Sequence, residues 1–409
     1  MKRPCIAIDV SKGQSHIQAF TDSETNISKV KVIDHDLNGF NQIMELAQYV
    51  EKKTGQAPVF VFEATGVYHR GLQAFLEKNN KTYHIVNPLQ SAKFRKQNLR
   101  TAKTDIRDCK NLARVYFGIN LREFKMQDDK YYELRQLSRF YEDNLVHLRK
   151  CKVSFNETLD IVFPGYRKVF QEVYCKAALE TLKKYPHPEM IVNKKPQSIA
   201  KYMMSKSEHR EEYCLKKANE LIALAKQCVS GCRVNDINVH ILKNQISQIE
   251  NYLEISETTL NTLINLAQEL PNFHIIKSIP GIGDNLAARI LAEIGDISNF
   301  TGPKQLVAYA GVDPIIYQSG KDNGEHRKIS KKGNKRLRCL LYLAVSCILR
   351  SKTSSTSIRT FYQKKTQQTS PLNSKAASLA CTNKLLRIIY GMCKTGCVYS
   401  QSVEIAVLP

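Results

Sequence analysis

The sequence predicts an α/β domain followed by an all-α region, and three observations support this fold class. Short apolar or alternating segments bounded by turn residues occupy residues 5–88, as is typical of strands. Apolar residues then recur at spacings of three and four through residues 127–270, as is typical of long helices. From residue 271 the helical pattern is shorter and contains glycine turns. We therefore expect domains at residues 1–122, 123–270 and 271–409.

In the first domain the elements are predicted in the order βββαβαβα, which describes a mixed sheet with helices packed on it. The turn sequences DVSKGQ and DSETN make the first three strands an antiparallel meander. The strands are expected at residues 5–10, 15–22, 27–36, 57–65 and 81–88. The helices are expected at residues 39–55, 68–80, 89–100 and 105–119.

The helical middle has two arms whose apolar residues follow a nearly heptad spacing. A proline-broken stretch at residues 185–197 separates the arms, so we expect a coiled-coil hairpin that serves dimerisation. An ordinary helical bundle produces the same pattern and stays open as an alternative. The spaced residues are Leu134, Leu137, Tyr141, Leu148, Cys151, Phe155 and Leu159 in the first arm, and Leu242, Ile246, Ile249, Leu253, Leu260, Leu263 and Leu270 in the second.

The third region begins with two predicted helices around the turn PGIG, in the sequence IIKSIPGIGDNLAARILAEIG. This pattern resembles the helix-hairpin-helix motif, in which backbone N–H groups at Gly281 and Gly283 and a helix N-terminus face a phosphate. A Gly-Pro turn between packed helices is the alternative. Beyond residue 350 a polar Ser/Thr-rich stretch predicts a flexible link, and residues 376–396 predict a terminal helix.

The charge balance points to a polyanionic partner. The chain has 61 Lys and Arg against 38 Asp and Glu, a formal net charge of +23, so nucleic acid is the first candidate. No segment approaches the ~20 apolar residues that a membrane span requires, and MKRPCIAIDV contains a strand and no signal-peptide core. We expect a cytoplasmic protein without membrane partners. Its 12 cysteines form no paired CxxC motifs, so reduced thiols are favoured over a zinc site.

Four acids form a candidate metal site. Asp9 ends the first strand and Glu63 ends the fourth, while Asp105 and Asp108 stand three apart on the closing helix. Like charges at that spacing repel each other, which favours a cation between them. Carboxylates at neighbouring strand ends and on a helix above them can converge on one point, and such oxygen donors suit Mg²⁺.

Two Mg²⁺ ions about 4 Å apart would hold both the attacking and the leaving oxygen of a phosphoryl transfer. Surrounding cations would then follow a nucleic-acid backbone. Each acid also has an ordinary interpretation, since Asp9 could begin a turn and Asp105 could be an N-terminal helix charge. The surrounding cations are Lys93, Arg95, Lys96, Arg100, Lys103, Arg107, Lys110 and Arg114.

Four linked sequence blocks resemble a known family. These blocks are AIDVSK with Asp9, FEATGVY with Glu63, KTDIRDCKNLA with Asp105 and Asp108, and a C-terminal group formed by SIPGIG, LVAYAGVDP, YQSGK and ISKKGNKRLR. They resemble the transposases and recombinases of bacterial insertion sequences that join a ribonuclease H-like, or RuvC-like, DEDD domain to a C-terminal serine-bearing domain. Pilin-gene invertases are relatives of that family. The helical middle carries least of the resemblance.

The resemblance implies roles that composition and spacing do not give. Asp9, Glu63, Asp105 and Asp108 would bind Mg²⁺, and Ser319 would be a nucleophile that joins covalently to DNA. The family also implies a structured guide RNA that pairs with donor and target DNA. It further implies a homo-oligomer, from dimer to tetramer, that acts at the nucleoid in the bacterial cytoplasm.

Without the resemblance, Ser319 is a turn serine in the loop DPIIYQSGKDNG, because a hydroxyl needs a base or a metal to become a nucleophile. The basic run after it predicts contacts with phosphates, and Gly324 and Gly333 would let the loop approach a backbone closely. The apolar segment CLLYLAVSCIL should anchor this run on a folded core. The cations of the run are Lys321, Arg327, Lys328, Lys331, Lys332, Lys335, Arg336 and Arg338.

The leading hypothesis is therefore a DNA transposase or recombinase that cuts and rejoins DNA with metal ions and Ser319. A ribonuclease H-like junction-resolving nuclease would use the four acids without a covalent intermediate. A catalytically silent nucleic-acid-binding protein is the third possibility. The residues that separate these hypotheses are Ser319, which only the first requires, and Asp9, which the third does not need.

Overall fold

A computed structural model describes residues 2–64, 66–86, 91, 105–119, 129–315, 318–319, 322–323, 329–351 and 356–400. At residues 105–107, 129, 318–319 and 322–323 it describes the backbone alone. The chain divides into two compact units, Met1–Met126 and Gln127–Pro409, and each is described by itself.

The first unit contains a five-stranded mixed sheet, as predicted. Its strands stand in the order β3-β2-β1-β4-β5. The β1–β2 and β2–β3 pairs are antiparallel and the β1–β4 and β4–β5 pairs are parallel, so the predicted meander is confirmed. The strands are β1 (Cys5–Val10), β2 (Gln14–Phe20), β3 (Lys31–Asp34), β4 (Val59–Glu63) and β5 (Tyr83–Val86).

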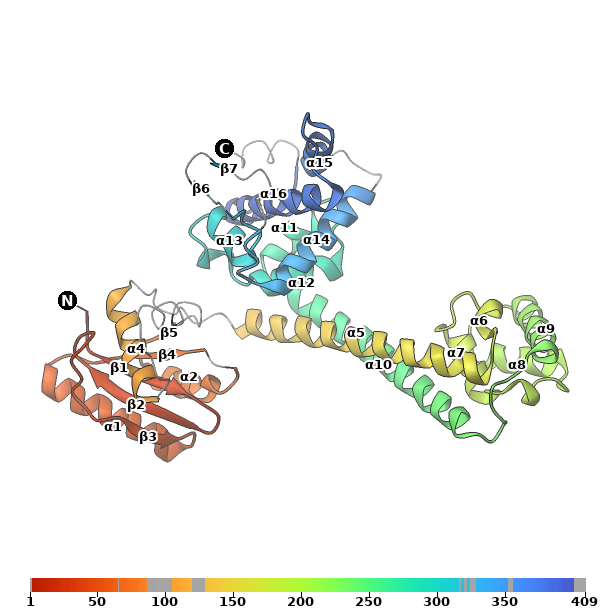
Figure 1. Cartoon of the computed structure of the whole chain (residues 1–409), viewed down its shortest axis with the longest axis horizontal. Helices are drawn as coiled ribbons and strands as arrows, with labels where there is room; N and C mark the ends of the chain where they lie inside the picture. Colours follow the sequence, from red (N-terminus) through yellow and green to blue (C-terminus); the bar gives the residue numbers. More distant parts are fainter. Residues whose placement is uncertain are drawn as a thin grey trace. The chain divides into compact units, whose positions relative to one another are not determined.

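Helices cover both faces of this sheet (Figure 1). One face packs on α1 (Leu37–Thr54) and α2 (His69–Lys78), and the other on α4 (Asp105–Gly118). Burial on both faces explains why β1 and β4 are nearly continuous apolar runs. The predicted helix at 89–100 lies outside the described residues except for Ser91.

The ends of α1 follow the local chemistry of the sequence. Asp36 caps the helix by accepting a hydrogen bond from the Gly39 amide at 2.7 Å. A Cβ at Gly39 would lie 2.0 Å from the carbonyl oxygen of Asp34, so this position requires glycine. Gly55 ends the helix in the left-handed region with φ 72°, as the sequence predicted.

In the second unit two long antiparallel helices, α5 (Asp129–Val162) and α10 (Ile237–Gln268), form a stalk, as the apolar spacing predicted (Figure 1). Buried Asn144 of α5 donates hydrogen bonds to the Tyr252 carbonyl at 2.9 Å and to the Ser256 hydroxyl at 2.6 Å. These bonds fix the register between the helices, because a buried amide without partners is unfavourable. Coiled-coil packing of the stalk stays a prediction.

A small helical module joins the two stalk helices, where the sequence predicted only a proline-broken stretch. We call it the distal module. Its core, which includes Phe170, Leu182 and Leu221, is continuous with the adjoining residues of both stalk helices. The fully buried Tyr166 donates its hydroxyl to the Ala178 carbonyl at 2.8 Å. The module contains α6 (Tyr166–Val169), α7 (Lys176–Lys184), the 3₁₀ turn η1 (Pro188–Met190), α8 (Pro196–Lys206) and α9 (Glu211–Gln227).

The C-terminal helices share a second core with the opposite end of the stalk, where Leu134 of α5 and Leu263 of α10 are fully buried. One helix occupies part of the stretch predicted as a flexible link. The boundary proposed near residue 270 stays a prediction. The helices are α11 (Asn272–Lys277), α12 (Asp284–Ile294), η2 (Ile297–Asn299), α13 (Pro303–Ala310), α14 (Lys335–Arg350), α15 (Ser357–Gln367) and α16 (Ser374–Thr395).

All twelve cysteines are free thiols. Four of them are buried and two, Cys339 and Cys397, are exposed. Among the described residues no helix has the length and apolar character needed to cross a membrane.

Candidate active site and nucleic-acid interface

Asp9 and Glu63 end two neighbouring parallel strands. Ile8 of β1 is level with Phe62 of β4, and the two acids are the next residue of each strand. Because side chains alternate between the faces of a sheet, both carboxylates belong to the face opposite Ile8 and Phe62. That face is the one covered by α4, and both acids are half-buried there.

The first turns of α4 pack over the same end of the sheet. The Cys109 thiol donates to the carbonyl oxygen of His16 at 3.3 Å, and His16 is the antiparallel partner of Asp9. Asp108, which directly precedes Cys109, is half-buried. The structure therefore brings Asp9, Glu63 and Asp108 to one region, although their sequence positions are far apart. Asp105 is the first residue of α4, and its side chain lies outside the described residues.

The donor chemistry of this region fits a hard divalent cation, since carboxylate oxygens are the ligands that Mg²⁺ prefers. Among the described side chains, no group of three or more His, Cys, Asp or Glu residues is close enough to hold a metal ion. The predicted four-acid set includes Asp105, so the whole set lies partly outside what the structure describes.

An ion-pair cluster holds α4 to the turn between β2 and β3. Arg114 donates to both carboxylate oxygens of Glu24, at 2.8 and 3.1 Å, and the Lys110 ammonium lies 2.8 Å from the same carboxylate. These contacts, with Arg114 first, lower the pKa of Glu24 to about 2. The sequence placed Lys110 and Arg114 along a nucleic-acid backbone, whereas here both cations are engaged with Glu24.

Ser319 lies at the end of a backbone hairpin in the second unit. Strand β6 (Gln318–Ser319) pairs antiparallel with β7 (Asp322–Asn323), and Ser319 is level with Asp322. The base of this hairpin, which we call its stem, is closed by a bridge between Pro314 and Ile329. We call the described residues 311–315, 318–319, 322–323 and 329–334 the serine hairpin. The Ser319 side chain lies outside the described residues, and so do Gly324 and the cations Lys321, Arg327 and Lys328.

The predicted glycine turn joins α11 to α12. Gly281 has φ 90°, and a Cβ there would lie 2.9 Å from the backbone of Ile348 in α14. This glycine therefore has a packing role that needs no nucleic acid. Gly283 is exposed and precedes α12, whose first residue, Asp284, forms an ion pair with Lys277 at 2.5 Å. A phosphate contact at this turn stays a prediction.

Two sequence models of transposase families match this chain in order. The DEDD transposase model of the IS110 type covers residues 6–164, and the model of the IS116/IS110/IS902 transposase family covers residues 273–363. The first contains all four predicted acids, and the second contains the glycine turn and Ser319. The chain belongs to the IS110-type transposases.

Relatives of this transposase agree with that assignment. The "Insertion element IS110 uncharacterized 43.6 kDa protein" of Streptomyces coelicolor is 22% identical over 75% of this chain and 74% of its own length. The "Mini-circle putative transposase for IS117" of the same species is 24% identical over 79% of each chain. The "Pilin gene-inverting protein" of Moraxella bovis is 29% identical over 34% of this chain and 41% of its own.

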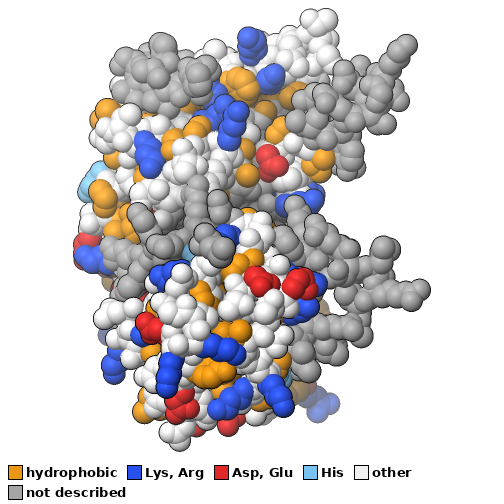
Figure 2. All heavy atoms as spheres, turned by 90° about the vertical axis from the view of Figure 1, so that its left-hand side faces the viewer, with side chains coloured by type: hydrophobic (Ala, Val, Ile, Leu, Met, Phe, Trp, Pro, Cys, Tyr) orange, Lys and Arg blue, Asp and Glu red, His pale blue; other side chains and the backbone are white. Residues whose placement is uncertain are grey.

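The described cations of the transposase's basic run differ in their surroundings. Arg336 contacts the carboxylates of Glu142 and Asp143 at 2.8 Å each, and Arg338 donates to the Ala310 carbonyl at 2.7 Å. Arg336 and Arg338 therefore help to attach α14 to its neighbours. Lys331, Lys332 and Lys335 are exposed. On the face shown in Figure 2, the described Lys and Arg side chains are dispersed among acidic and apolar side chains.

Gly333 does approach a backbone closely, but the backbone is the protein's own. A Cβ at Gly333 would lie 2.4 Å from the Tyr309 carbonyl oxygen and 2.7 Å from the Gly311 amide nitrogen. The stem of the serine hairpin therefore packs directly against the end of α13. The sequence had predicted that this glycine approaches a nucleic-acid backbone.

Sequence analysis missed a buried carboxylate at the base of the serine hairpin. Glu293 of α12 is only 1% exposed and binds Arg139 of α5 and Asn334 before α14. Burial raises its pKa, but the hydrogen bonds from Arg139 and Asn334 outweigh burial and hold the pKa of Glu293 below its ordinary value. The sequence signal was an acid inside the apolar helix AARILAEI.

Proposed function

We propose that this transposase cleaves and rejoins DNA through an acid site formed by Asp9, Glu63, Asp105 and Asp108 and through Ser319 as nucleophile. The observation that carries the proposal is the position of Asp9 and Glu63 at the ends of two adjacent strands, under the helix that bears the other two acids. The strand order, with β2 as the antiparallel strand, supports a ribonuclease H-like class for the first unit.

The acids would bind Mg²⁺, which supplies charge stabilisation for the phosphoryl group when bound. Asp9 and Glu63 would present their carboxylates from the ends of the central strands β1 and β4, and Asp105 and Asp108 from α4. In the proposed step the Ser319 oxygen forms a bond to phosphorus while the bond from phosphorus to a deoxyribose oxygen breaks. The serine proton leaves to a base, and the released hydroxyl gains a proton.

A phosphoserine intermediate keeps the energy of the broken phosphodiester, so a second DNA end can displace the serine without an external energy source. Hydrolysis would lose that energy. This difference distinguishes strand transfer from the action of a junction-resolving nuclease. The described exposed cations Lys331, Lys332 and Lys335, at the base of the serine hairpin, would contact phosphates of the DNA.

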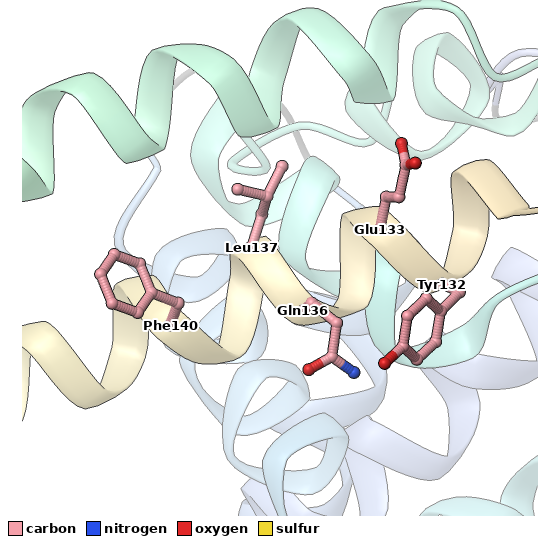
Figure 3. Close-up of a pocket in the computed structure, with 5 residues that line it drawn as sticks. All are labelled: Tyr132, Glu133, Gln136, Leu137 and Phe140. Carbon is pink, nitrogen blue, oxygen red and sulfur yellow. The ribbon is translucent and has the colours of Figure 1, made fainter. Parts of the chain in front are cut away.

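A second copy of the chain is the partner we propose for the outer face of α5. Exposed apolar side chains run along this helix, among them Phe140 at 55% and Val153 at 59% exposure. Near Phe140, a surface depression of about 400 Å³ is lined by α5 side chains that extend to both sides of the helix (Figure 3). Apolar side chains of this kind are enriched in homodimer interfaces.

The charges along α5 match an antiparallel pairing of two copies. A two-fold axis between residues 146 and 147 would place Phe140 opposite Val153 and Asp143 opposite Lys150 of the second copy. The same axis would place Tyr132 opposite Ile161, and both are exposed. In these three pairs apolar residues meet apolar residues and opposite charges meet each other.

The deciding experiment tests for a covalent adduct between protein and DNA. The full chain is produced together with the sequences that flank its gene, and labelled DNA from the element ends is incubated with Mg²⁺. We expect an adduct that resists detergent with the natural chain and none with Ser319→Ala. Asp9→Asn and Glu63→Gln should also abolish it. Asp34→Asn, a carboxylate at the end of edge strand β3, is the matched control and should retain it.

Other outcomes identify the alternatives. Full DNA cleavage by Ser319→Ala without any adduct would establish a nuclease. Unaltered recombination by Asp9→Asn would show that the acid site is not catalytic.

A structured guide RNA is tested by sequencing the RNA that copurifies with the chain. A discrete species from the flanking element supports guidance. Random host RNA would leave the net charge of +23 as the explanation for RNA binding.

A further inference from the structure

Glu293 has both carboxylate oxygens engaged in the interior of the second unit. Arg139 donates from Nε to Oε1 at 3.0 Å and from Nη2 to Oε2 at 3.1 Å. Asn334 donates from Nδ2 to Oε2 at 2.6 Å. A buried charge is tolerated when it is paired and hydrogen-bonded in this way. Such a site holds its donors in one geometry, because a displaced donor would leave the buried charge unsatisfied.

Asn334 connects this carboxylate to the serine hairpin. Its Oδ1 accepts a hydrogen bond from the Leu337 amide at 3.1 Å and thereby caps α14. Its backbone amide donates to the Tyr309 carbonyl at 2.7 Å, at the end of α13. The residue therefore joins three elements, and its side-chain nitrogen is the atom held by Glu293.

The returning strand of the hairpin runs directly into Asn334. Ser330 donates its amide to the Asp313 carbonyl at 2.9 Å and its hydroxyl to the Asp313 carboxylate at 2.6 Å. Lys331 donates its amide to the Gly311 carbonyl at 3.1 Å and has φ 54°, a left-handed conformation that non-glycine residues rarely adopt. Such a conformation persists when neighbouring contacts fix it. These contacts fix the backbone of the stem, from which the strand that carries Ser319 extends.

We propose that Glu293 is a positioning residue that fixes the serine hairpin for strand transfer by holding Asn334. Arg139 makes the stalk helix α5 part of the same support, because it binds the same carboxylate. The inference rests on the proposed role of Ser319 as nucleophile. Glu293 itself touches neither DNA nor the reacting atoms in this role.

The chemistry of the pair defines two variants of nearly unchanged volume. Glu293→Gln places an amide donor where one oxygen accepts from Arg139 or Asn334. Asn334→Asp keeps the helix cap, because aspartate is as good an N-cap as asparagine, but it presents a second carboxylate to Glu293. The double variant exchanges donor and acceptor, so an amide at 293 can again bond a carboxylate at 334.

The test measures the rate of adduct formation at saturating DNA with the full chain, its Mg²⁺ and its copurified RNA. We expect each single variant to slow the reaction by about tenfold to a hundredfold, as a small displacement of a reacting group does, while DNA affinity stays within about twofold. The double variant should recover most of the rate. Asn373→Asp is the matched control, since Asn373 caps α16 through the Ala376 amide at 2.9 Å.

Hydrogen exchange adds a readout that is independent of chemistry. The amides of Ser330 and Lys331 should exchange faster in Glu293→Gln, while those of the distal module keep their rates. Normal adduct rates in both single variants would overturn the inference and leave the proposed function intact. An equal loss of DNA binding and rate, without rescue by the double variant, would also overturn it. No adduct with the natural chain would refute the proposed function and this inference together.

Discussion

Replacing Gly333 with serine tests how closely the serine hairpin packs on the end of α13. A Cβ at this position would lie 2.4 Å from the Tyr309 carbonyl oxygen, 2.7 Å from the Gly311 amide nitrogen and 2.9 Å from the Ala308 carbonyl oxygen. All three are backbone atoms, so no side-chain rotation can relieve the overlap. Residue 333 must move, and Asn334 with the start of α14 must move with it.

The size of the effect follows from the number of overlaps. Overpacking a rigid site destabilises a protein by about 1–3 kcal/mol, and three backbone overlaps place this site near 3 kcal/mol. In a unit of this size, about 3 kcal/mol corresponds to a fall of roughly 5 °C in the unfolding midpoint. Backbone strain adds nothing, because Gly333 does not have a positive φ.

The assay is calorimetric unfolding of the full chain, followed at the transition of the second unit. Gly302→Ser is the matched control, because a Cβ there has nothing within 4 Å and Gly302 precedes α13 as an N-cap, a position that serine favours. We expect the control to keep the midpoint of the natural chain. Equal midpoints for Gly333→Ser and Gly302→Ser would refute the close packing of the stem.

Four further outcomes are expected. Phe140→Glu should convert the proposed dimer to monomers in light scattering; an unchanged mass would exclude α5 as the interface. Asn144→Ala should lower the free energy of unfolding by about 1–3 kcal/mol, because it removes two hydrogen bonds to α10 and leaves the Tyr252 carbonyl with the Ser256 hydroxyl as its side-chain donor; an unchanged denaturation midpoint would contradict this. Iodoacetamide should label exposed Cys397 and leave Cys5 unmodified in the folded chain, because burial raises the pKa of the Cys5 thiol; rapid labelling of Cys5 would show the core to be open. The pKa of Glu293 lies below its ordinary 4.5, so the natural chain should exceed Glu293→Gln in free energy of unfolding by a full amount above about pH 4.5 and by less as the pH falls below that value. A difference in free energy that grows on acidification would contradict this.

Local patterns were sufficient to predict the sheet and one side of the acid site. The apolar runs around Asp9 and Glu63 predicted two buried strands that end at the acids, and the observed register then assigns both acids to one face. Gly55 ended α1 as predicted, because the left-handed conformation is a property of a single residue. The apolar spacing of each stalk helix likewise depends on that helix alone, so each helix could be predicted without knowing its partner.

Pairings between distant residues could not be predicted from one sequence. Arg139 lies 154 positions before its partner Glu293, and Arg336 lies 194 positions after Glu142. In the sequence, every cation of the basic run was predicted to contact phosphates, because the acids that bind Arg336 belong to α5. Gly333 was misinterpreted for the same reason, since the backbone that it approaches, at residues 308–311, precedes Gly333 by about two dozen residues. The distal module was missed because its helices are short and its core is built from all of them.

The two stalk helices begin and end next to each other at the distal module, where the Gly231 amide donates to the Ile161 carbonyl at 2.8 Å. The chain therefore returns to the end of α5 a few residues before α10 begins at Ile237. The module covers one end of the stalk, and its core includes the stalk residues Phe155 and Ile246. A reporter domain that replaces the module must therefore bury these residues, while the buried cluster at the opposite end of the stalk keeps every one of its packing partners.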